Sequence, residues 1–203
     1  MKNLQTHRAR LSEAASIPDR ALRALSVAAV IGDALARAGA MPVLVGGGAV
    51  EIYSRSAYTT RDLDFVVGPI DRVTKPMQLL GFEKEGRHWI ESRLGIAVEF
   101  PGTVLGPAES IEIEVHGMQL HVIAVEDLIV DRLASWKHWH WNPDGAAAAI
   151  LLALHEDLDS ERLEKRAQQE DVLDALESIR AAALEQAELS DELLTQLRER
   201  LTR

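Results

Sequence analysis

The sequence predicts an α/β (α+β) fold, a mixed β-sheet flanked by helices, with a helical C-terminal appendage. Residues 8–39 carry apolar residues close to the 3.6-residue helical period. Six short segments between residues 42 and 124 are apolar or alternate with period two, as strands do. From residue 125 onward the pattern is helical again. We therefore expect an α/β domain over 1–125, which includes the N-terminal helix, and a helical region over 126–203 packed on it.

The first elements are bounded by glycines. Gly39 can end the helix predicted over 8–39. A buried strand over 42–45 is stopped by three glycines, and a short helix follows over 48–57. Residues 61–67 form the next strand, and residues 68–82 form a turn and a helix that ends near Gly81.

Two hairpins and several helices complete the chain. Residues 87–93 and 95–101 are expected to pair across a turn near Gly95, and 111–117 with 118–124 across Gly117. A helix is predicted over 125–139, and "NPDG" at 142–145 is predicted to break it. Two or more helices then continue to the end.

Composition excludes several classes of protein. The 203-residue chain has a formal net charge of −10 and no cysteine, which argues against wrapping of duplex DNA and rules out disulfides and thiolate metal sites. No apolar stretch is long enough to cross a bilayer. The N-terminus is too charged for a secretory signal. We expect a cytoplasmic protein with no membrane partner.

Three consecutive glycines lie between a predicted strand and a predicted helix. Gly46, Gly47 and Gly48 would allow a ligand to approach the backbone closely, and the free N–H groups of a helix N-terminus favour a phosphate. The alternative is a tight strand-to-helix turn with no ligand.

Two aspartates follow on the next strand. Because strand side chains alternate, Asp62 and Asp64 project to one face while Leu63 and Phe65 point to the core. Carboxylates placed side by side in this way can hold Mg²⁺, which prefers oxygen ligands. The alternative is a solvated strand start in which an aspartate caps a turn.

A third acid is expected for two-metal phosphoryl transfer. Glu99 lies on the face opposite Ile96, Val98 and Phe100 of an otherwise apolar strand, where an uncompensated carboxylate would be costly. Glu112 and Glu114 are rivals, but a solvated surface explains them better.

Together these residues resemble the nucleotidyltransferase fold superfamily, whose members include DNA polymerase β and kanamycin nucleotidyltransferase. Its pattern is Gly-Gly or Gly-Ser, a spacer, then Asp-hydrophobic-Asp or Glu. Here Gly47–Gly48 is followed by residues 49–61 and then by Asp62–Leu63–Asp64. "VLVGGGAVEIYSR", "TTRDLDFVV" and "AVEFP" are most similar to the small bacterial branch that includes abortive-infection type-E toxins. The resemblance covers about residues 20–155.

The resemblance implies a nucleotidyltransferase-type sheet and a set of roles. Gly47 and Gly48 would bind the nucleotide triphosphate, Asp62 and Asp64 would bind Mg²⁺ or Mn²⁺, and Glu99 would bind a second ion and help activate the acceptor hydroxyl. A nucleoside monophosphate would pass to RNA, a protein or a small molecule, with release of pyrophosphate. The sequence departs from the family in having Glu rather than Asp as its third acid.

Several other residues are weaker candidates. Arg55 and Arg61 can reach a phosphate or pair with surface acids. Arg87 and His88, just before a strand, can contact substrate or simply cover the sheet edge. By resemblance alone, the active cleft would also include basic and acidic residues after the sheet, namely Arg132, Lys137 and Asp144. Asp144 is explained more simply as a helix N-cap.

Three tryptophans fall within six residues. Trp136, Trp139 and His140 are expected to share a helical face beside Lys137, as a platform on which bases stack. A packed helix end or an oligomer interface, which we favour, explains the same residues. His138 and His140 have no partner at a convincing zinc spacing.

Three functional hypotheses remain open. The first is a Mg²⁺-dependent nucleotidyltransferase, with a toxin-like role in a toxin–antitoxin or phage-defence pair as one form of it. The second is a catalytically degenerate module that binds a nucleotide or a partner. The third is an interaction protein whose acidic helical tail docks a cognate protein.

Overall fold

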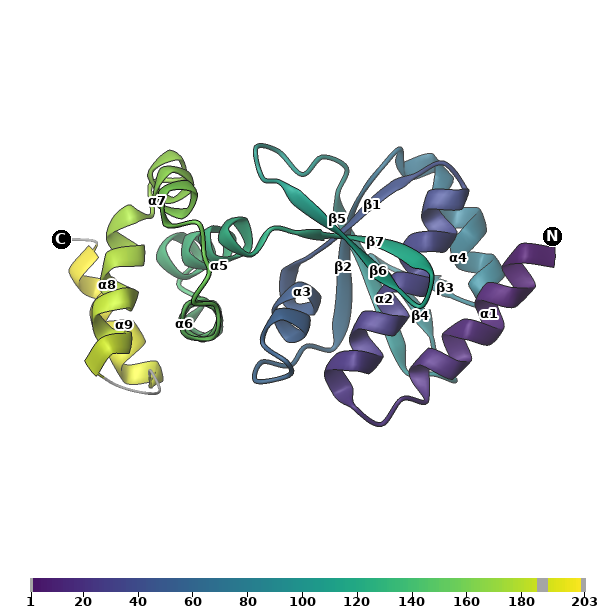
Figure 1. The fold of residues 1–203 in the computed structure, drawn as a ribbon, viewed down its shortest axis with the longest axis horizontal. Coiled ribbons are helices and arrows are strands. Elements are labelled where there is room, and N and C mark those ends of the chain that lie inside the picture. Colours follow the sequence, from purple (N-terminus) through teal and green to yellow (C-terminus); the bar gives the residue numbers. More distant parts are fainter. Residues whose placement is uncertain (1, 186–189, 202–203) are drawn as a thin grey trace. The chain divides into compact units, whose positions relative to one another are not determined.

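A seven-stranded mixed sheet organises the first part of the chain in this computed structural model, which describes residues 2–185 and 190–201 (Figure 1). The chain divides into two compact units, Met1–Ile123 and Ala124–Arg203, and each is described by itself. The first unit contains the sheet, and the second is helical. The α/β class and the helical C-terminal region predicted from the sequence are therefore present.

The strand order is β3-β4-β5-β2-β1-β7-β6. The central strand β2 pairs antiparallel with β1 and parallel with β5, and β1 pairs parallel with β7. Both predicted hairpins are found, as β4–β5 and β6–β7, while β3 was not predicted. The bounds are β1 Met41–Val45, β2 Asp62–Gly68, β3 Glu83–Glu85, β4 His88–Glu91, β5 Ile96–Gly102, β6 Ser110–Val115 and β7 Met118–Ile123.

The helix predicted over 8–39 is in fact two helices, α1 (Lys2–Ala15) and α2 (Arg20–Arg37). Pro18 disfavours a helical conformation at Ile17, which ends the first helix. Asp19 then begins the second as its N-cap, because its side chain accepts a hydrogen bond from the backbone N–H of Leu22. Helical periodicity continued through this break, so the pattern alone did not reveal it.

Helix α2 packs on β1 and β7, and it also contacts α1 and α4 (Thr74–Leu80) (Figure 1). A Cβ atom added at Gly32 of α2 would lie 3.2 Å from Cδ1 of Leu120 in β7, so helix and sheet are in close contact. On β2, Leu63, Phe65 and Val67 are buried. The opposite face of that strand is only half-buried, and this leaves its aspartates accessible.

The second unit is built from five helices in its described part. Their bounds are α5 Val125–Trp139, α6 Asn142–Leu154, α7 Ser160–Gln169, α8 Leu173–Glu185 and α9 Asp191–Leu201. Asp127 is buried and forms ion pairs with Arg162 and Arg166, which join α5 to α7. A buried carboxylate that is paired with two guanidinium groups is a structural feature.

The sequence prediction for residues 142–145 was wrong in detail. "NPDG" forms the first turn of α6, because proline is well tolerated there, and the break lies at His140–Trp141. Asp144 is not the N-cap. It is buried inside that first turn and accepts a hydrogen bond from Arg132 at 2.9 Å.

The tryptophans do not form one surface. Trp136 is fully buried against Gly145, where an added Cβ would lie 2.9 Å from its ring. Trp139 is 81% exposed and Trp141 is 59% exposed. Trp136 and Trp139 therefore do not share the face that the sequence suggested, and a helix end with one packed tryptophan describes the region better.

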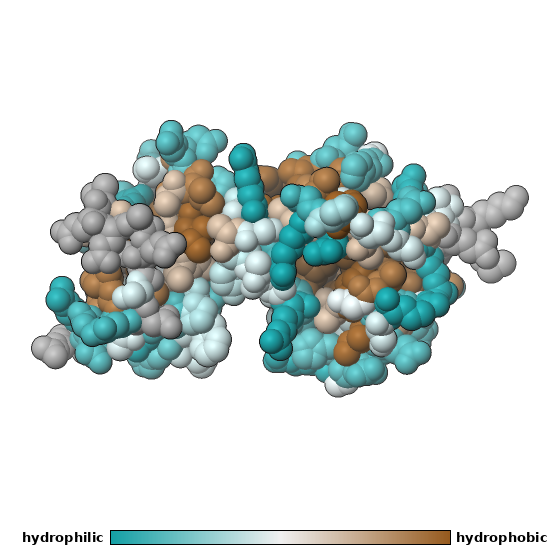
Figure 2. Space-filling model, turned by 90° about the horizontal axis from the view of Figure 1, so that it is seen from below, coloured by the Kyte–Doolittle hydropathy of each residue, from teal (hydrophilic) through white to brown (hydrophobic). Residues whose placement is uncertain are grey.

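The surface shown in Figure 2 is largely hydrophilic. Hydrophilic residues cover much of the face shown in Figure 2, and apolar patches interrupt them in both units. Among the described residues, none of the helices has the length and apolarity that a membrane span requires.

Candidate functional site

The predicted acidic residues meet on one face of the sheet. In the parallel pairing of β2 with β5, Asp64 lies beside Glu99 and Asp62 beside Ala97. In the antiparallel pairing of β4 with β5, His88 lies beside Glu99. Because paired residues project to the same face, His88, Glu99 and Asp64 form a row across three strands, with Asp62 one step along β2.

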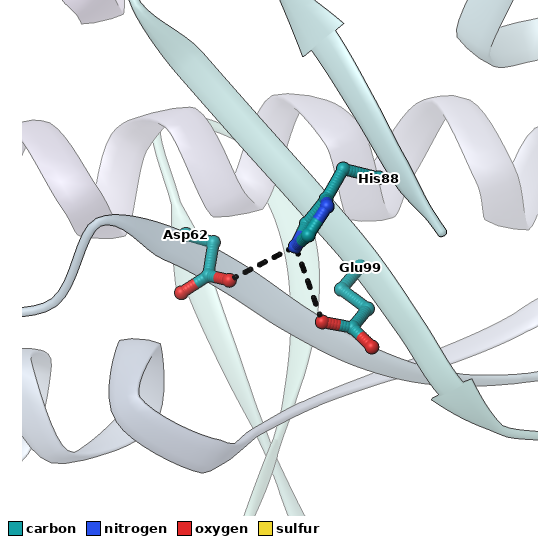
Figure 3. Close-up of side chains that lie close together, drawn as sticks. All are labelled: Asp62, His88 and Glu99. Carbon is teal, nitrogen blue, oxygen red and sulfur yellow. Dashed lines mark ion pairs between the residues drawn. The ribbon is translucent and has the colours of Figure 1, made fainter. Parts of the chain in front are cut away.

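Three of these side chains converge (Figure 3). The Nε2 atom of His88 lies 3.5 Å from Oε2 of Glu99 and 3.7 Å from Oδ2 of Asp62. The side chain of Glu99 is 15% exposed, whereas those of Asp62 and His88 are about 30% exposed (29% and 32%). The cluster is therefore sheltered by the sheet but open to a ligand from solvent.

The donor atoms of Asp62, His88 and Glu99 all lie within 4.8 Å of one another. Two carboxylates and an imidazole are ordinary ligands of divalent cations. Asp64 lies on the same face, although it is not a member of this group of three. The residues present therefore fit a divalent ion, with a composition different from the Asp62, Asp64 and Glu99 set predicted from the sequence.

A cationic side chain, that of Arg87, reaches the cluster from the loop before β4. Nε of Arg87 lies 3.4 Å from Oε2 of Glu99, and the Arg87 side chain is 74% exposed. An exposed ion pair of this kind contributes little to stability and is easily exchanged for another partner. Glu99 thus has a cationic partner, Arg87, that a metal ion can replace.

The glycine turn lies beside the aspartates because of the β1–β2 register. Val45, the last residue of β1, pairs with Asp64, so α3 (Gly46–Tyr53) begins next to it. Gly46 has a φ of +60°, and a Cβ atom added there would lie 2.3 Å from Oδ2 of Asp64. A Cβ at Gly47 would lie 2.8 Å from Oγ1 of Thr60. Glycine is required here for close packing of the α3 N-terminus against the β2 start.

A buried carboxylate holds the loop that leads into β2. Glu51 accepts hydrogen bonds from Arg20 at 2.7 Å and from the backbone N–H of Thr60 at 2.9 Å. The hydroxyl of Thr60 in turn donates to Asp62 at 3.2 Å. This chain of bonds fixes Asp62 at the start of its strand and connects it to α2 and α3.

Next to Asp62 is a pocket with a volume of about 350 Å³, whose basic lining residues are Arg20, Arg23 and Arg61. Arg20 is engaged by Glu51. Within the part of the chain that the structure describes, Arg23 and Arg61 form no ion pair. Uncompensated guanidinium groups in a pocket of an otherwise acidic protein favour an anionic ligand.

The remaining predicted residues are placed as follows. Gly47 and Gly48 lie in the first turn of α3, and Arg61 is exposed at the pocket. Lys137 belongs to the second unit, where its Nζ atom donates to the Asp171 carbonyl at 2.6 Å and to Asp174 at 2.9 Å. Its assignment to nucleotide binding stays a prediction.

The sequence did not assign His88 to the metal cluster or Glu51 to the support of Asp62. For His88 the sequence predicts only a substrate contact or a position that covers the sheet edge. Its register opposite Glu99 depends on the length of the β4–β5 turn, which the sequence marks only by Gly95. Glu51 did give a signal, since it is a charged residue in the apolar helix "GGGAVEIY".

Comparisons with known proteins bear on the fold. No protein-family model matches the sequence, and no curated protein matches it. The chain is similar to the crystal structure of an antigenic nucleotidyltransferase-like protein from Paracoccidioides brasiliensis, with a TM-score of 0.51 and 16% sequence identity. The alignment covers 76% of this chain and 92% of that one. At this identity the likeness concerns the fold alone: the chain has a nucleotidyltransferase-like α/β fold.

Proposed function

We propose that the protein is a divalent-metal-dependent nucleotidyltransferase, which moves a nucleoside monophosphate from a nucleoside triphosphate to a hydroxyl group of RNA, a protein or a small molecule. The observation that carries the proposal is the meeting of Asp62, Asp64 and Glu99 on one face of β2 and β5, beside the glycine turn. The nucleotidyltransferase-like fold supports it independently.

The glycine turn and the arginine pocket suit the two ends of a triphosphate. Gly47 and Gly48 are buried in the first turn of α3, where the first N–H groups have no acceptor within the helix. In the proposed complex these groups would donate to phosphate oxygens. Arg61 and Arg23 offer further donors in the pocket that Asp62 also lines. Donors from two directions would hold the nucleotide across the carboxylates.

A divalent ion, either Mg²⁺ or Mn²⁺, would be held by Asp62 and Glu99, with Asp64 beside them. When bound, it neutralises charge that develops on the transferring phosphoryl group. The protein's own contribution is to orient the nucleotide through the α3 backbone and the arginines. Glu99, as one of the residues that would hold the ion, would also help to activate the acceptor hydroxyl.

A second candidate is a binding module of the same fold that has lost the chemistry. The observation that favours it is the ion pair between Glu99 and Arg87, which compensates the carboxylate charge without any metal. Such a module would bind a nucleotide at the glycine turn and the arginine pocket, and would show no turnover.

The resemblance to toxin-like nucleotidyltransferases adds a biological proposal. We place the protein in the cytoplasm as a toxin-like enzyme with a cognate protein partner. Induced expression in a bacterial host tests this: growth arrest that the Asp62→Asn, Asp64→Asn double variant abolishes supports it, and equal growth of both cultures overturns it.

A labelling reaction tests the enzymatic proposal. The protein is mixed with each α-labelled nucleoside triphosphate, Mg²⁺ or Mn²⁺, and separate RNA, protein and small-molecule fractions of cell extract, with the double variant as control. Label that enters one fraction, and is lost in the double variant, establishes transfer and the acceptor class. Metal-dependent nucleotide binding without label in any fraction favours the binding module.

A further inference from the structure

His88 gives the acidic cluster an imidazole donor. Its Nε2 atom lies 3.5 Å and 3.7 Å from the facing carboxylate oxygens of Glu99 and Asp62, longer than a good N–H···O hydrogen bond of about 2.7–3.2 Å. Ligands at about 2.0–2.2 Å from one ion are separated from each other by roughly 3–3.7 Å. The two separations that involve His88 are therefore those of ligands on one ion rather than of a tight ion pair, and all three donors lie within 4.8 Å of one another (Figure 3).

We propose that Asp62, His88 and Glu99 form a site that selects a first-row transition-metal dication, with Mn²⁺ as its probe, over Mg²⁺, and that His88 sets this preference. Mg²⁺ takes oxygen ligands and gives up its water reluctantly, so an imidazole adds little to its affinity. Transition-metal dications accept imidazole readily. Replacing one carboxylate of an all-oxygen set by His88 therefore favours the transition metal.

The surroundings allow the ion to enter. The Arg87 side chain, which pairs with Glu99 from outside, is 74% exposed and can swing into solvent when an ion neutralises Glu99. His88 is 32% exposed, and its ring lies against both carboxylates without a short bond to either. Entry of an ion thus breaks only long, partly exposed contacts.

The inference rests on the proposed function only in what the bound ion is used for. The binding of the ion does not depend on that function. The decisive experiment therefore measures binding alone. Metal-free full-length protein at pH 8 is titrated with Mn²⁺, the free ion is followed by electron paramagnetic resonance, and Mg²⁺ is added as competitor. We expect Mn²⁺ to bind at least about tenfold more tightly than Mg²⁺.

The variant His88→Asn removes the imidazole. We expect it to lower Mn²⁺ affinity by about tenfold or more while Mg²⁺ affinity stays within about twofold. In the wild type, the spin echo of bound Mn²⁺ is expected to show modulation from a coordinated imidazole ¹⁴N nucleus, and His88→Asn to lack it. This spectroscopic signal needs no variant to be informative, and His88→Gln serves if His88→Asn does not fold.

A matched control lies in the same unit. His121 on β7 pairs with Glu112 on β6 at 3.4 Å, but this pair lies outside the group of three. His121→Asn is expected to leave both metal affinities unchanged. Equal affinities for Mn²⁺ and Mg²⁺, wild-type Mn²⁺ affinity in His88→Asn, or an echo without ¹⁴N modulation would each overturn the proposal.

The labelling reaction separates this inference from the proposed function. Imidazole-dependent Mn²⁺ binding without any nucleotidyl transfer would leave the metal site standing and reject the enzyme. Nucleotidyl transfer by a protein whose Mn²⁺ affinity does not depend on His88 would support the enzyme and reject the proposed role of His88 at the metal site.

Discussion

Two histidine–carboxylate clusters in the first unit differ in how tightly they are closed. Asp33, on α2, receives hydrogen bonds at 2.6 Å from His7 of α1 and at 2.6 Å from Arg37. Asp62 and Glu99 stand 3.5–3.7 Å from His88. The Asp33 cluster has short bonds that satisfy its carboxylate, whereas the Asp62–Glu99 cluster leaves a space between its donors. Closed geometry indicates a structural role, and the open geometry indicates a place for a ligand.

The protonation of Asp33 agrees with this difference. Burial by itself raises the pKa of the carboxyl, but hydrogen bonds from Arg37 and His7 outweigh it and hold the pKa of Asp33 below the usual 3.8. Asp33 is therefore charged and fully used at neutral pH. Its bond with His7 joins α1 to α2, so it stabilises the packing of the two N-terminal helices on each other.

The largest expected effect is on transfer. Asp62→Asn with Asp64→Asn removes the negative charge that would hold a divalent ion, and we expect the labelling activity to fall by about 10³-fold or more. The same change relieves repulsion between neighbouring carboxylates, so the melting temperature without metal should stay the same or rise. A large drop in melting temperature would instead make the pair structural, like Asp33.

The glycine turn gives the next effect, because it controls how closely α3 approaches Asp64. Gly46→Ala introduces a side chain at a φ of +60° and a Cβ only 2.3 Å from a carboxylate oxygen. We expect a loss of stability of about 2 kcal/mol or more, and weaker nucleotide binding. Equilibrium denaturation and nucleotide titration measure the two.

Gly95→Ala is the matched control, since Gly95 has a φ of +66° and an added Cβ would meet nothing within 4 Å. It carries the backbone strain, about 1–2 kcal/mol, without the clash. Equal losses in the two variants would mean that the close approach to Asp64 has no energetic consequence.

The sequence predicted most of the sheet because its strands alternate clearly, and it predicted the Asp62–Asp64 face because strand geometry requires it. The sequence also predicted Glu99 as the third acid of the site, since an isolated acid on an apolar strand is conspicuous. The break at Pro18 was missed because helical periodicity continues through it. The start of α6 at Asn142 was missed because a proline in the first turn of a helix looks like a helix breaker in the sequence. His88 depended on strand register, which tertiary pairing decides.

A smaller effect is expected on stability from the closed cluster. Asp33→Asn removes one charged partner and leaves His7 and Arg37 without it, so we expect a loss of about 1–3 kcal/mol in the free energy of unfolding. Mn²⁺ affinity and nucleotidyl transfer should be unchanged in the folded variant. A loss of metal binding in Asp33→Asn would show that the two clusters are coupled, and the contrast between them would fail.

The smallest effect is the pH dependence of the difference in unfolding free energy between the wild type and Asp33→Asn. Because the folded-state pKa of Asp33 lies below the ordinary value of 3.8, its stabilisation is complete above about pH 4 and is lost as pH falls through the folded-state pKa. Urea denaturation of wild type and Asp33→Asn, at pH values from 7 down to the acid limit of folding, measures the gap between them. The difference in unfolding free energy should be constant near pH 7 and should narrow below pH 4, because Asp33 of the wild type then takes up a proton in both the folded and the unfolded state. A gap that stays constant through pH 4, down to the acid limit of folding, would contradict the assignment of this pH dependence to the Asp33 carboxylate.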